Sequence, residues 1–341
     1  MNLGLVFGGQ SYEHEISIVS AITLKDVLKK EVKFIFCDKD RDFYLIDPKN
    51  MKATYFSSFE YKKSKKLILK NGGFFSEGAF SSKKIDVQVY VNLIHGCDGE
   101  DGKIASLFEF FDVKFIGTRL KPAILSYDKV LTKFLTNITG VKTLNYQILK
   151  RNEEITIKPP FILKPATLGS SIGISIVKDE SEITYALDKS FEFDDTLLVE
   201  PFFEGVRECN LAGYKADSKM EFSMIEEPNK DEFLDFDQKY LRFSDSKTIK
   251  EANLDEKLKE KLRKAFSKIY SYGFDGSLIR CDFFIINDEI YLNEINTNPG
   301  SLAHYLFDNF EDRLYDLARN LPSYKKIEID YNYVKSISVY K

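Results

Sequence analysis

The sequence has few cysteines and no long hydrophobic run. Its four cysteines, Cys37, Cys97, Cys209 and Cys281, lie far apart and form no C-x-x-C pair. This spacing predicts neither a disulfide framework nor a zinc site. No apolar run approaches the roughly 18–20 residues that a transmembrane helix needs, and the N-terminus lacks the basic start and apolar stretch of a signal peptide. We therefore expect a protein of the reducing cytoplasm.

An excess of charge of one sign is also absent. The formal net charge is −4 over 341 residues, and lysine and glutamate are interspersed along the chain. A nucleic-acid-binding protein would carry a basic stripe, whereas interspersed charges are typical of a solvated surface. We therefore expect neither nucleic acid nor a membrane as a partner. The 43% hydrophobic and 30% charged residues are typical of a globular protein, and the length suits two or three packed lobes.

The first third of the chain alternates between strand and helix patterns. Predicted helices begin at Ile16 and cover about 103–111, and predicted strands cover Asn2–Phe7, Val32–Cys37, Asp86–Leu93 and Val113–Ile116. This order predicts a parallel sheet covered by helices. Residues 48–84 show no clear period.

The pattern changes after Gly117-Thr118. A predicted helix at 128–136 leads to strands that turn back on each other across short loops, which is an antiparallel arrangement. The predicted strands are 161–164, 174–177, 196–200, 208–214, 278–286 and 289–295, with helices at 180–189 and 254–272. We expect an α/β lobe at 1–118 followed by two α+β lobes at 119–205 and 206–341.

The strongest cluster of functional residues lies on the last two predicted strands. Residues two apart in a strand face the same side, so Arg280 lies beside Asp282, and Glu294 beside Asn296. Two carboxylates and an amide oxygen suit Mg²⁺, and the guanidinium suits a transferring phosphoryl group. A solvated strand face with a salt bridge is the alternative. The polar loop 296–300 with Gly300 argues against it, because its backbone N–H groups can face an anion.

Two glycine-rich loops and one loop of small residues are further candidate sites. Lys164 precedes the loop 166–173, which offers a charge and backbone amides to phosphates, although many such loops are only turns. Glu13 and Glu15 follow Gly8-Gly9 without the G-x-G-x-x-G pattern of a dinucleotide site. They suit an ammonium group, and capping of the following helix is the alternative. His95 lies in a glycine-rich loop after a predicted parallel strand, where ligands commonly bind.

These segments occur in the order and spacing of the D-alanine–D-alanine ligases of the ATP-grasp superfamily, which the chain resembles from Leu3 to about Leu321. Six pieces carry the resemblance: Gly8-Gly9 with Glu13-x-Glu15-Ile16-Ser17, His95-Gly96 with Gly99-Glu100-Asp101-Gly102, Ser126-x-Asp128-Lys129, Lys164-Pro165 with Gly169-Ser170-Ser171-x-Gly173, Lys239-Tyr240, and Asn293-Glu294-x-Asn296-Thr297-x-Pro299-Gly300.

The resemblance implies ATP and two Mg²⁺ (or Mn²⁺) ions as cofactors. The implied phosphate contacts are Lys129, Lys164 and Lys239. Glu200 and the main chain near Phe203 would contact the adenine, and Glu208 would contact the ribose. The implied metal ligands are Asp282, Glu294 and Asn296. Glu13 and His95 would hold the first D-alanine, and Ser170 and Tyr240 would close the site. Arg280 and the N–H of Gly300 would stabilise the oxyanion of a tetrahedral intermediate.

The implied reaction joins two D-alanine molecules through a D-alanyl phosphate, for peptidoglycan precursor synthesis. The family also suggests a homodimer formed through the N-terminal lobe, and the loops 166–173 and 227–250 are candidate lids.

Tyr305 aligns where many relatives have a serine beside the second substrate, so a ligase making D-alanyl-D-lactate or D-alanyl-D-serine is an alternative. Tyr240 favours the dipeptide. Two broader alternatives are another ATP-grasp carboxylate–amine ligase and a nucleotide-binding regulator without turnover. The tail 323–341 lies outside the resemblance and is a candidate edge strand or interface element.

Overall fold

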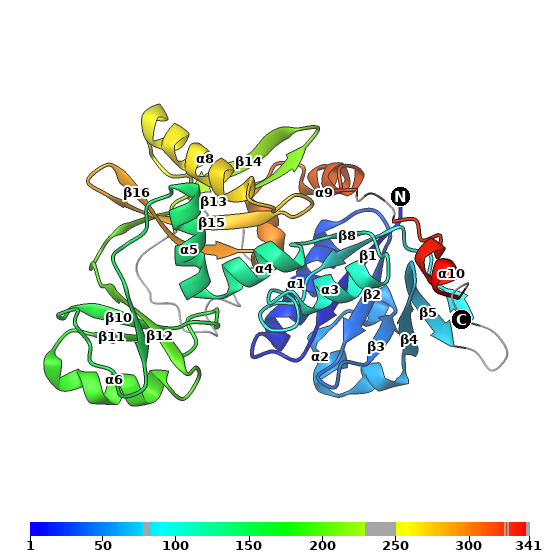
Figure 1. Ribbon diagram of the computed structural model, residues 1–341, viewed down its shortest axis with the longest axis horizontal. Helices are drawn as coiled ribbons and strands as arrows, with labels where there is room; N and C mark the ends of the chain where they lie inside the picture. The colour runs from blue at the N-terminus through cyan, green and yellow to red at the C-terminus, as the bar shows by residue number, and fades with distance from the viewer. Residues whose placement is uncertain (78–81, 229–249, 324, 326, 339–341) are drawn as a thin grey trace.

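The computed structural model describes residues 1–77, 82–228, 250–323, 325 and 327–338. Three β-sheets follow one another along these residues (Figure 1). The first has eight strands, and the second and third have four each. The architecture is an α/β lobe followed by α+β lobes, which confirms the predicted fold class. No helix among the described residues is long and apolar enough to cross a membrane.

The first sheet has the strand order β6-β5-β4-β3-β2-β1-β7-β8. Its parallel half consists of β2 (Val32–Cys37), β1 (Leu3–Gly8), β7 (Val89–Asn92) and β8 (Phe115–Ile116). The strands β1, β7 and β8 are buried along their whole length, as expected for parallel strands between helices. Helices α1 (His14–Val27) and α3 (Lys103–Phe110) belong to this lobe.

The antiparallel half of the first sheet was not predicted from the sequence. It contains β3 (Phe43–Ile46), β4 (Lys65–Lys70), β5 (Gly73–Glu77) and β6 (Ser82–Lys84), with α2 (Ala53–Ser57) and short 3₁₀ turns at 48–50 and 60–63 between β3 and β4. The strands β4 and β6 carry mostly exposed lysines. Lysines protect sheet edges from aggregation but disrupt the hydrophobic alternation that marks a strand.

The second sheet has the order β11-β10-β12-β9. Its strands are β9 (Gln147–Lys150), β10 (Phe161–Pro165), β11 (Ser175–Val177) and β12 (Thr196–Pro201), and all of them pair antiparallel. The predicted hairpin across 166–173 is therefore confirmed, whereas β9 was not predicted. A 3₁₀ turn at 180–182 leads into α6 (Ile183–Ser190).

The third sheet has the order β14-β13-β15-β16. Its strands are β13 (Arg207–Ala216), β14 (Lys219–Glu226), β15 (Ile279–Ile286) and β16 (Glu289–Asn296). The predicted turn at Asn287-Asp288 is confirmed, with φ of 51° and 58°, as a two-residue hairpin turn requires. Helix α8 (Glu256–Tyr270) packs its apolar face against β13 and β15 in one buried cluster.

The chain returns to the first lobe after the third sheet. Helices α4 (Leu120–Tyr127) and α5 (Lys129–Thr139) connect the first two sheets. The turn Gly300–Leu306 and helix α9 (Phe310–Arg319) pack their apolar residues into the same core as β1 and α1. The first and third sheets therefore share a buried boundary.

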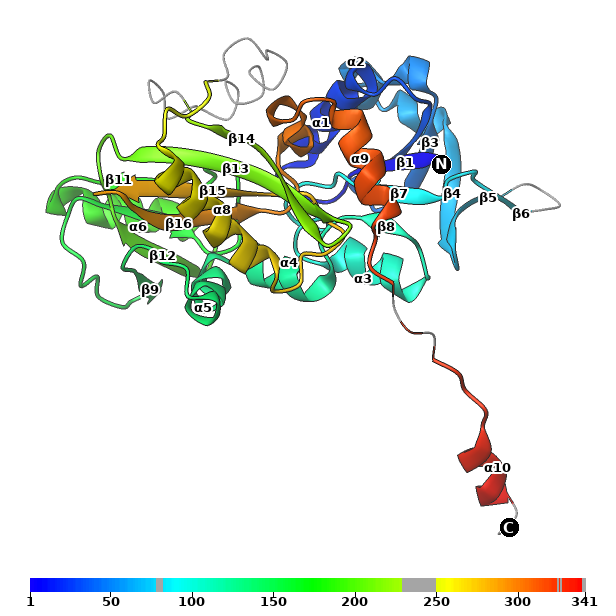
Figure 2. The same cartoon turned by 90° about the horizontal axis from the view of Figure 1, so that it is seen from above.

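The C-terminal tail does not form the candidate edge strand. The described residues 327–331 have no strand, and 332–338 form α10 (Asn332–Ser338). In Figure 2, α10 stands away from the three sheets. The alternating sequence Ile327–Tyr331 pairs with none of the strands among the described residues.

Candidate functional site

Four of the predicted site residues share one face of the third sheet. The strands β15 and β16 pair antiparallel with Asp282 opposite Glu294 and Arg280 opposite Asn296. Arg280 donates to both oxygens of Asp282, at 2.7 and 2.8 Å. The amide of Asn296 donates to Asp282 at 2.9 Å and to Glu294 at 3.3 Å. The bidentate ion pair buries the carboxylate of Asp282, so this is not a solvated strand face.

The carboxylates on this face crowd one another. Burial and the Glu294 carboxylate raise the pKa of Asp282 to about 6 against the opposing effect of Arg280. Burial, Asp282 and Glu294 raise the pKa of Glu208, on β13, to about 7. Closely spaced carboxylates resist simultaneous ionisation, and a divalent cation would relieve their repulsion. The oxygens of Asp282, Glu294 and Asn296 are the hard ligands that Mg²⁺ prefers, so the residues fit the predicted metal.

The second sheet contributes a buried cluster of two lysines around one carboxylate. Lys164, on β10, donates to Glu200 at 2.6 Å and to Asn293 at 2.9 Å. Lys133, on α5, donates to the other oxygen of Glu200. Burial raises the pKa of Glu200, but the two lysines outweigh it and lower that pKa. The contact with Asn293 joins this cluster to the third sheet.

Lys129 reaches the same region from the first turn of α5. Its ammonium donates to the carbonyl of Leu168, in the loop of small residues between β10 and β11. Asp128 caps the helix by accepting from the N–H groups of Val130 and Leu131, at 2.7 and 3.1 Å. Burial lowers the pKa of Lys129, and the charges of Glu294 and Glu13 oppose that shift. Lys129 is therefore close enough to feel the charges of both Glu294, on β16, and Glu13, before α1.

Glu13 meets Ser170 across the boundary of the first two lobes. The Ser170 hydroxyl donates to the Glu13 carboxylate, and the Cα of Gly169 lies so close that a Cβ there would be 3.1 Å from Glu13 Oε2. Glu13 is buried and makes no side-chain cap on α1. The capping alternative is therefore wrong for Glu13. Glu15 is exposed in the first turn of α1, where an acidic residue suits the helix dipole.

His95 and Glu100 belong to the loop between β7 and α3. The ring of His95 is buried, and burial lowers its pKa to about 4. Glu100 accepts from the N–H of Gly96 at 3.0 Å and from the hydroxyl of Thr297 at 3.0 Å. Burial and the charge of Glu13 raise the pKa of Glu100 to about 8. Thr297 follows Asn296 directly, so this loop touches the end of β16.

Gly300 opens a turn with an unusual backbone. Ser301, Leu302 and Ala303 all have positive φ, at 47°, 54° and 49°. A non-glycine residue in this region is strained, and strain persists only where the surroundings enforce it. The turn is held by the N–H of Leu302, which donates to Pro299 O at 2.7 Å, and by the burial of Leu302 and Ala303.

The remaining predicted residues lie around these clusters. Tyr305 lies against Arg280, and burial raises the pKa of its hydroxyl to about 12. Phe203 is 43% exposed just after β12. Lys239 and Tyr240 lie outside the described residues, as does most of the candidate lid 227–250. The structure thus brings together residues from all three lobes: Glu13, His95, Lys129, Lys164, Ser170, Glu200, Glu208, Arg280, Asp282, Glu294, Asn296, Gly300 and Tyr305.

Two polar residues of this region had no role in the sequence analysis. Lys133 lies one helical turn after Lys129, a spacing that puts both on the same face of α5. Asn210, on β13, stands opposite Asp282, and its amide donates to Glu226 at 3.1 Å. The spacing from Lys129 could have indicated Lys133. Asn210 is identified only by the strand pairing.

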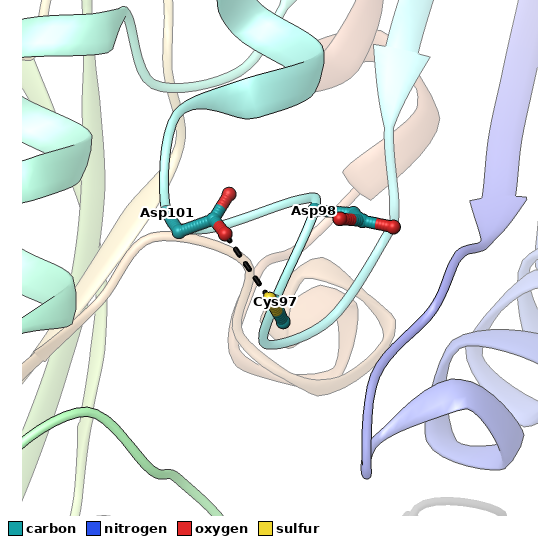
Figure 3. A group of neighbouring side chains, drawn as sticks. All are labelled: Cys97, Asp98 and Asp101. Carbon is teal, nitrogen blue, oxygen red and sulfur yellow. Dashed lines mark hydrogen bonds between the residues drawn. The ribbon is translucent and has the colours of Figure 1, made fainter. Parts of the chain in front are cut away.

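Among the described residues, one further cluster brings together potential metal ligands (Figure 3). Cys97, Asp98 and Asp101 have ligand atoms within 4.8 Å of one another. Arg41 donates to both oxygens of Asp98 at 2.9 Å, and Lys103 donates to Asp101. These cations already neutralise the two carboxylates. We therefore interpret the cluster as a structural link between the β7–α3 loop and the turn after β2.

Comparisons with known proteins agree with this geometry. A family model for the D-ala D-ala ligase N-terminus matches residues 2–118, and one for the D-ala D-ala ligase C-terminus matches residues 130–312. A D-alanine–D-alanine ligase of Campylobacter concisus is 59% identical over 100% of this chain and 99% of its own length. One of Campylobacter lari is 56% identical over 99% of this chain and 98% of its own length.

A solved structure supports the same relationship. The crystal structure of the D-alanine–D-alanine ligase from Helicobacter pylori is 46% identical, covers 95% of this chain and 100% of its own, and has a TM-score of 0.85. The identity is high enough to show the family as well as the fold. The chain therefore belongs to the D-alanine–D-alanine ligase family, and it is a ligase enzyme.

Proposed function

We propose that this chain joins two D-alanine molecules into D-alanyl-D-alanine for peptidoglycan precursor synthesis, with release of ADP and phosphate. The observation that carries the proposal is the meeting of Glu13, the lysine cluster and the Arg280–Asp282 face from three separate lobes. An ammonium site, a phosphate site and a site for an oxyanion are the three parts that an ATP-dependent carboxylate–amine ligation needs. The wider alternative of a regulator without turnover is not favoured, because the chain belongs to an enzyme family.

The nucleotide is placed between the second and third sheets. Lys129 and Lys164 supply positive charge to its phosphates, and Lys239 is assigned to the γ-phosphate. Glu200, the main chain at Phe203 and Glu208 are assigned to the adenine and ribose. Lys164 donates to Glu200 and Asn293, and these contacts fix its ammonium in the proposed phosphate site.

Asp282, Glu294 and Asn296 are the proposed ligands of two Mg²⁺ (or Mn²⁺) ions. Their oxygen donors support this assignment. Arg280 forms an ion pair with Asp282, which supports a guanidinium placed directly beside the proposed metal ligands. Magnesium, when bound, neutralises charge on the phosphate oxygens of ATP.

The first D-alanine is proposed to bind with its ammonium at Glu13 and its carboxylate near His95. Its carboxylate oxygen attacks the γ-phosphorus, the bond to ADP breaks, and D-alanyl phosphate forms. A carboxylate is a poor acyl electrophile, so this step gives it a good leaving group. Ser170 and Tyr240 are assigned to closing the site, which keeps water from hydrolysing the acyl phosphate.

The second D-alanine attacks through its deprotonated amine. The carbonyl carbon becomes tetrahedral, its oxygen gains negative charge, and phosphate leaves as the peptide bond forms. Arg280 and the N–H of Gly300 are assigned to that oxyanion. Tyr305 lies against Arg280 and is therefore placed beside the second substrate.

The chain is further proposed to act as a homodimer in the cytoplasm, with domains at 1–118, 119–205 and 206–341. Apolar residues are exposed on the outer side of α3 and α4, at Leu107, Phe110, Leu120 and Ile124. Leu120 and Ile124 also line a hollow of about 620 Å³. Exposed apolar patches of this kind support an interface. The three sheets support the proposed domains, and the four free cysteines suit a reducing compartment.

The proposed function is tested by measuring ADP release from the purified protein with Mg²⁺, ATP and D-alanine, with L-alanine, D-serine and D-lactate in parallel. We expect ADP and D-alanyl-D-alanine to form when D-alanine is the substrate, and no such turnover with L-alanine, D-serine or D-lactate in its place. Asp282→Asn should abolish turnover while leaving the protein folded. ADP that forms only when D-lactate accompanies D-alanine would assign the chain to depsipeptide synthesis and implicate Tyr305. No D-alanine-dependent turnover in a folded protein that binds ATP would refute the proposal.

A further inference from the structure

Ser20 lies at the point where three parts of the proposed site meet. It is on the inner face of α1, with 2% of its surface exposed. Its hydroxyl oxygen accepts from the backbone N–H of Ser301 at 3.1 Å and lies 3.0 Å from Nε2 of His95. One small side chain thus joins the helix that follows Glu13, the His95 loop and the turn that follows Gly300.

The hydrogen bonds of Ser20 determine which nitrogen of His95 carries the proton. A serine hydroxyl has a single proton to donate. The oxygen already accepts the N–H of Ser301, and its only other partner among the described residues is His95. If Nε2 carried the proton, the serine proton would be buried without an acceptor, which is costly. The serine therefore donates to Nε2, and the neutral ring keeps its proton on Nδ1.

The other side of the ring is consistent with this arrangement. Nδ1 of His95 is 3.9 Å from Oε1 of Glu100. Both oxygens of Glu100 already accept hydrogen bonds, from Gly96 and Thr297. At 3.9 Å the contact with Glu100 is too long for a hydrogen bond, so it does not engage a proton on Nδ1.

We propose that Ser20 is a positioning residue that fixes His95 as its Nδ1–H tautomer, so that His95 presents a hydrogen-bond donor to the carboxylate of the first D-alanine. This inference rests on the proposed function, because it takes His95 as the residue beside that carboxylate. A ring free to exchange tautomers would present a lone pair to the carboxylate part of the time. The carboxylate can only accept, so that form of the ring opposes binding.

Ser20 also anchors the strained turn after Gly300. Ser301, Leu302 and Ala303 adopt left-handed conformations, and the N–H of Ser301 is held by Ser20. The hydroxyl of Ser301 has no hydrogen-bond partner among the described residues, so its backbone N–H makes the contact that ties it to α1. Loss of the Ser20 hydroxyl therefore disturbs both the His95 ring and the placement of Gly300.

The tautomer is measured directly by long-range ¹⁵N–¹H NMR of protein labelled at histidine. The chain has three histidines, and the His95 signals are those missing from His95→Gln. His14 and His304 serve as internal references, because their Nδ1 atoms face the carbonyls of Gly9 and Ser301 and must donate. We expect His95 as pure Nδ1–H in the unsubstituted protein. In Ser20→Ala we expect a mixture of tautomers.

A matched pair of variants separates positioning from general packing. Ser17 is also buried on α1. Its hydroxyl donates to Leu93 O at 2.6 Å and accepts from Gly8 N at 2.8 Å, and it makes no hydrogen bond to His95 among the described residues. We expect Ser20→Ala to lower kcat/KM for D-alanine about tenfold, as for one lost hydrogen bond, with the KM for ATP unchanged. Ser17→Ala should leave the His95 tautomer unchanged, and Ser20→Thr should restore it because the hydroxyl remains.

These experiments separate the positioning role proposed for Ser20 from the substrate-binding role proposed for His95. If His95→Gln does not change D-alanine kinetics, the role proposed for His95 is wrong. If His95→Gln impairs the enzyme but Ser20→Ala leaves both tautomer and kcat/KM unchanged, the inference about Ser20 alone is overturned. A pure Nε2–H tautomer of His95 in the unsubstituted protein would overturn it as well.

Discussion

At the residue scale, the site depends on buried ionisable groups whose surroundings come from distant parts of the chain. Glu200 is balanced by Lys133 and Lys164, which are 67 and 36 residues away in sequence. The sequence assigned Glu200 to the nucleotide through a family pattern, but nothing near it indicated two lysine partners. Residue types and motifs could be identified from the sequence. Their charge partners could not, because those partners come from other elements.

Glu100 provides a prediction about pH at this scale. Its folded pKa is raised from 4.5 to about 8 by burial and by Glu13. Between those values the folded protein holds a proton that the unfolded chain releases, so this group makes stability fall as the pH rises. Glu100→Gln removes the titration. We compare the free energy of unfolding of Glu100→Gln with that of the unsubstituted protein. We expect the difference, in favour of Glu100→Gln, to grow by on the order of 1–3 kcal/mol from pH 5 to pH 8.

The measurement is urea unfolding at pH 5, 6.5 and 8 without ligands. Glu15→Gln is the matched control, because Glu15 is an exposed glutamate near the start of the same lobe. It should shift stability equally at all three pH values. Parallel pH profiles for the unsubstituted protein and Glu100→Gln would contradict the prediction.

At the element scale, long elements with a clear period were predicted and short charged ones were not. Helix α8 and the β15–β16 hairpin appear close to their expected bounds. Strands β4 and β6 were missed because half or more of their side chains are lysine and no hydrophobic alternation marks them. The tail at 327–331 shows the converse, since it has the alternation but pairs with no strand among the described residues.

Asp128 links an element to the site and gives a second prediction. It caps α5 at the residue before Lys129. We expect Asp128→Ala to lower the free energy of unfolding by about 1 kcal/mol, the usual cost of a lost N-cap, and to raise the KM for ATP because the first turn that holds Lys129 loosens.

Asp179→Ala is the comparison for Asp128→Ala. Asp179 caps the 3₁₀ turn before α6 and lies in an exposed capping box. The Asp179→Ala variant should have a lower free energy of unfolding than the unsubstituted protein but the same KM for ATP. Equal effects of the two variants on that KM would show that the cap does not position Lys129.

At the scale of the whole molecule, the proposed site exists only because three lobes meet. Ser170 reaches Glu13 from 157 residues away, Lys164 reaches Asn293 from 129, and Thr297 reaches Glu100 from 197. Each contact joins a different pair of lobes. Binding at such boundaries couples substrate capture to lobe closure.

The proposed homodimer is tested at the same scale. We expect Phe110→Asp, a charge placed on the exposed face of α3, to give a monomer in light scattering while the unsubstituted protein is a dimer. Phe110 is 81% exposed. Burying a carboxylate in an apolar interface is unfavourable. Tyr185→Asp, on α6 at 75% exposure, should leave the dimer intact. A dimer that persists in Phe110→Asp would exclude this face.

The sequence by itself determined the order of the lobes, the four polar side chains that β15 and β16 present on one face, and the family, because these rest on local periodicity and on motifs of adjacent residues. Only the tertiary structure decided which of these groups form hydrogen bonds or ion pairs with one another. Ser20, Lys133 and Asn210 carry no motif, and they matter only through contacts with His95, Glu200 and Glu226. Burial and neighbouring charge set the pKa of a group, and both depend on residues that the fold brings together from far apart in the chain.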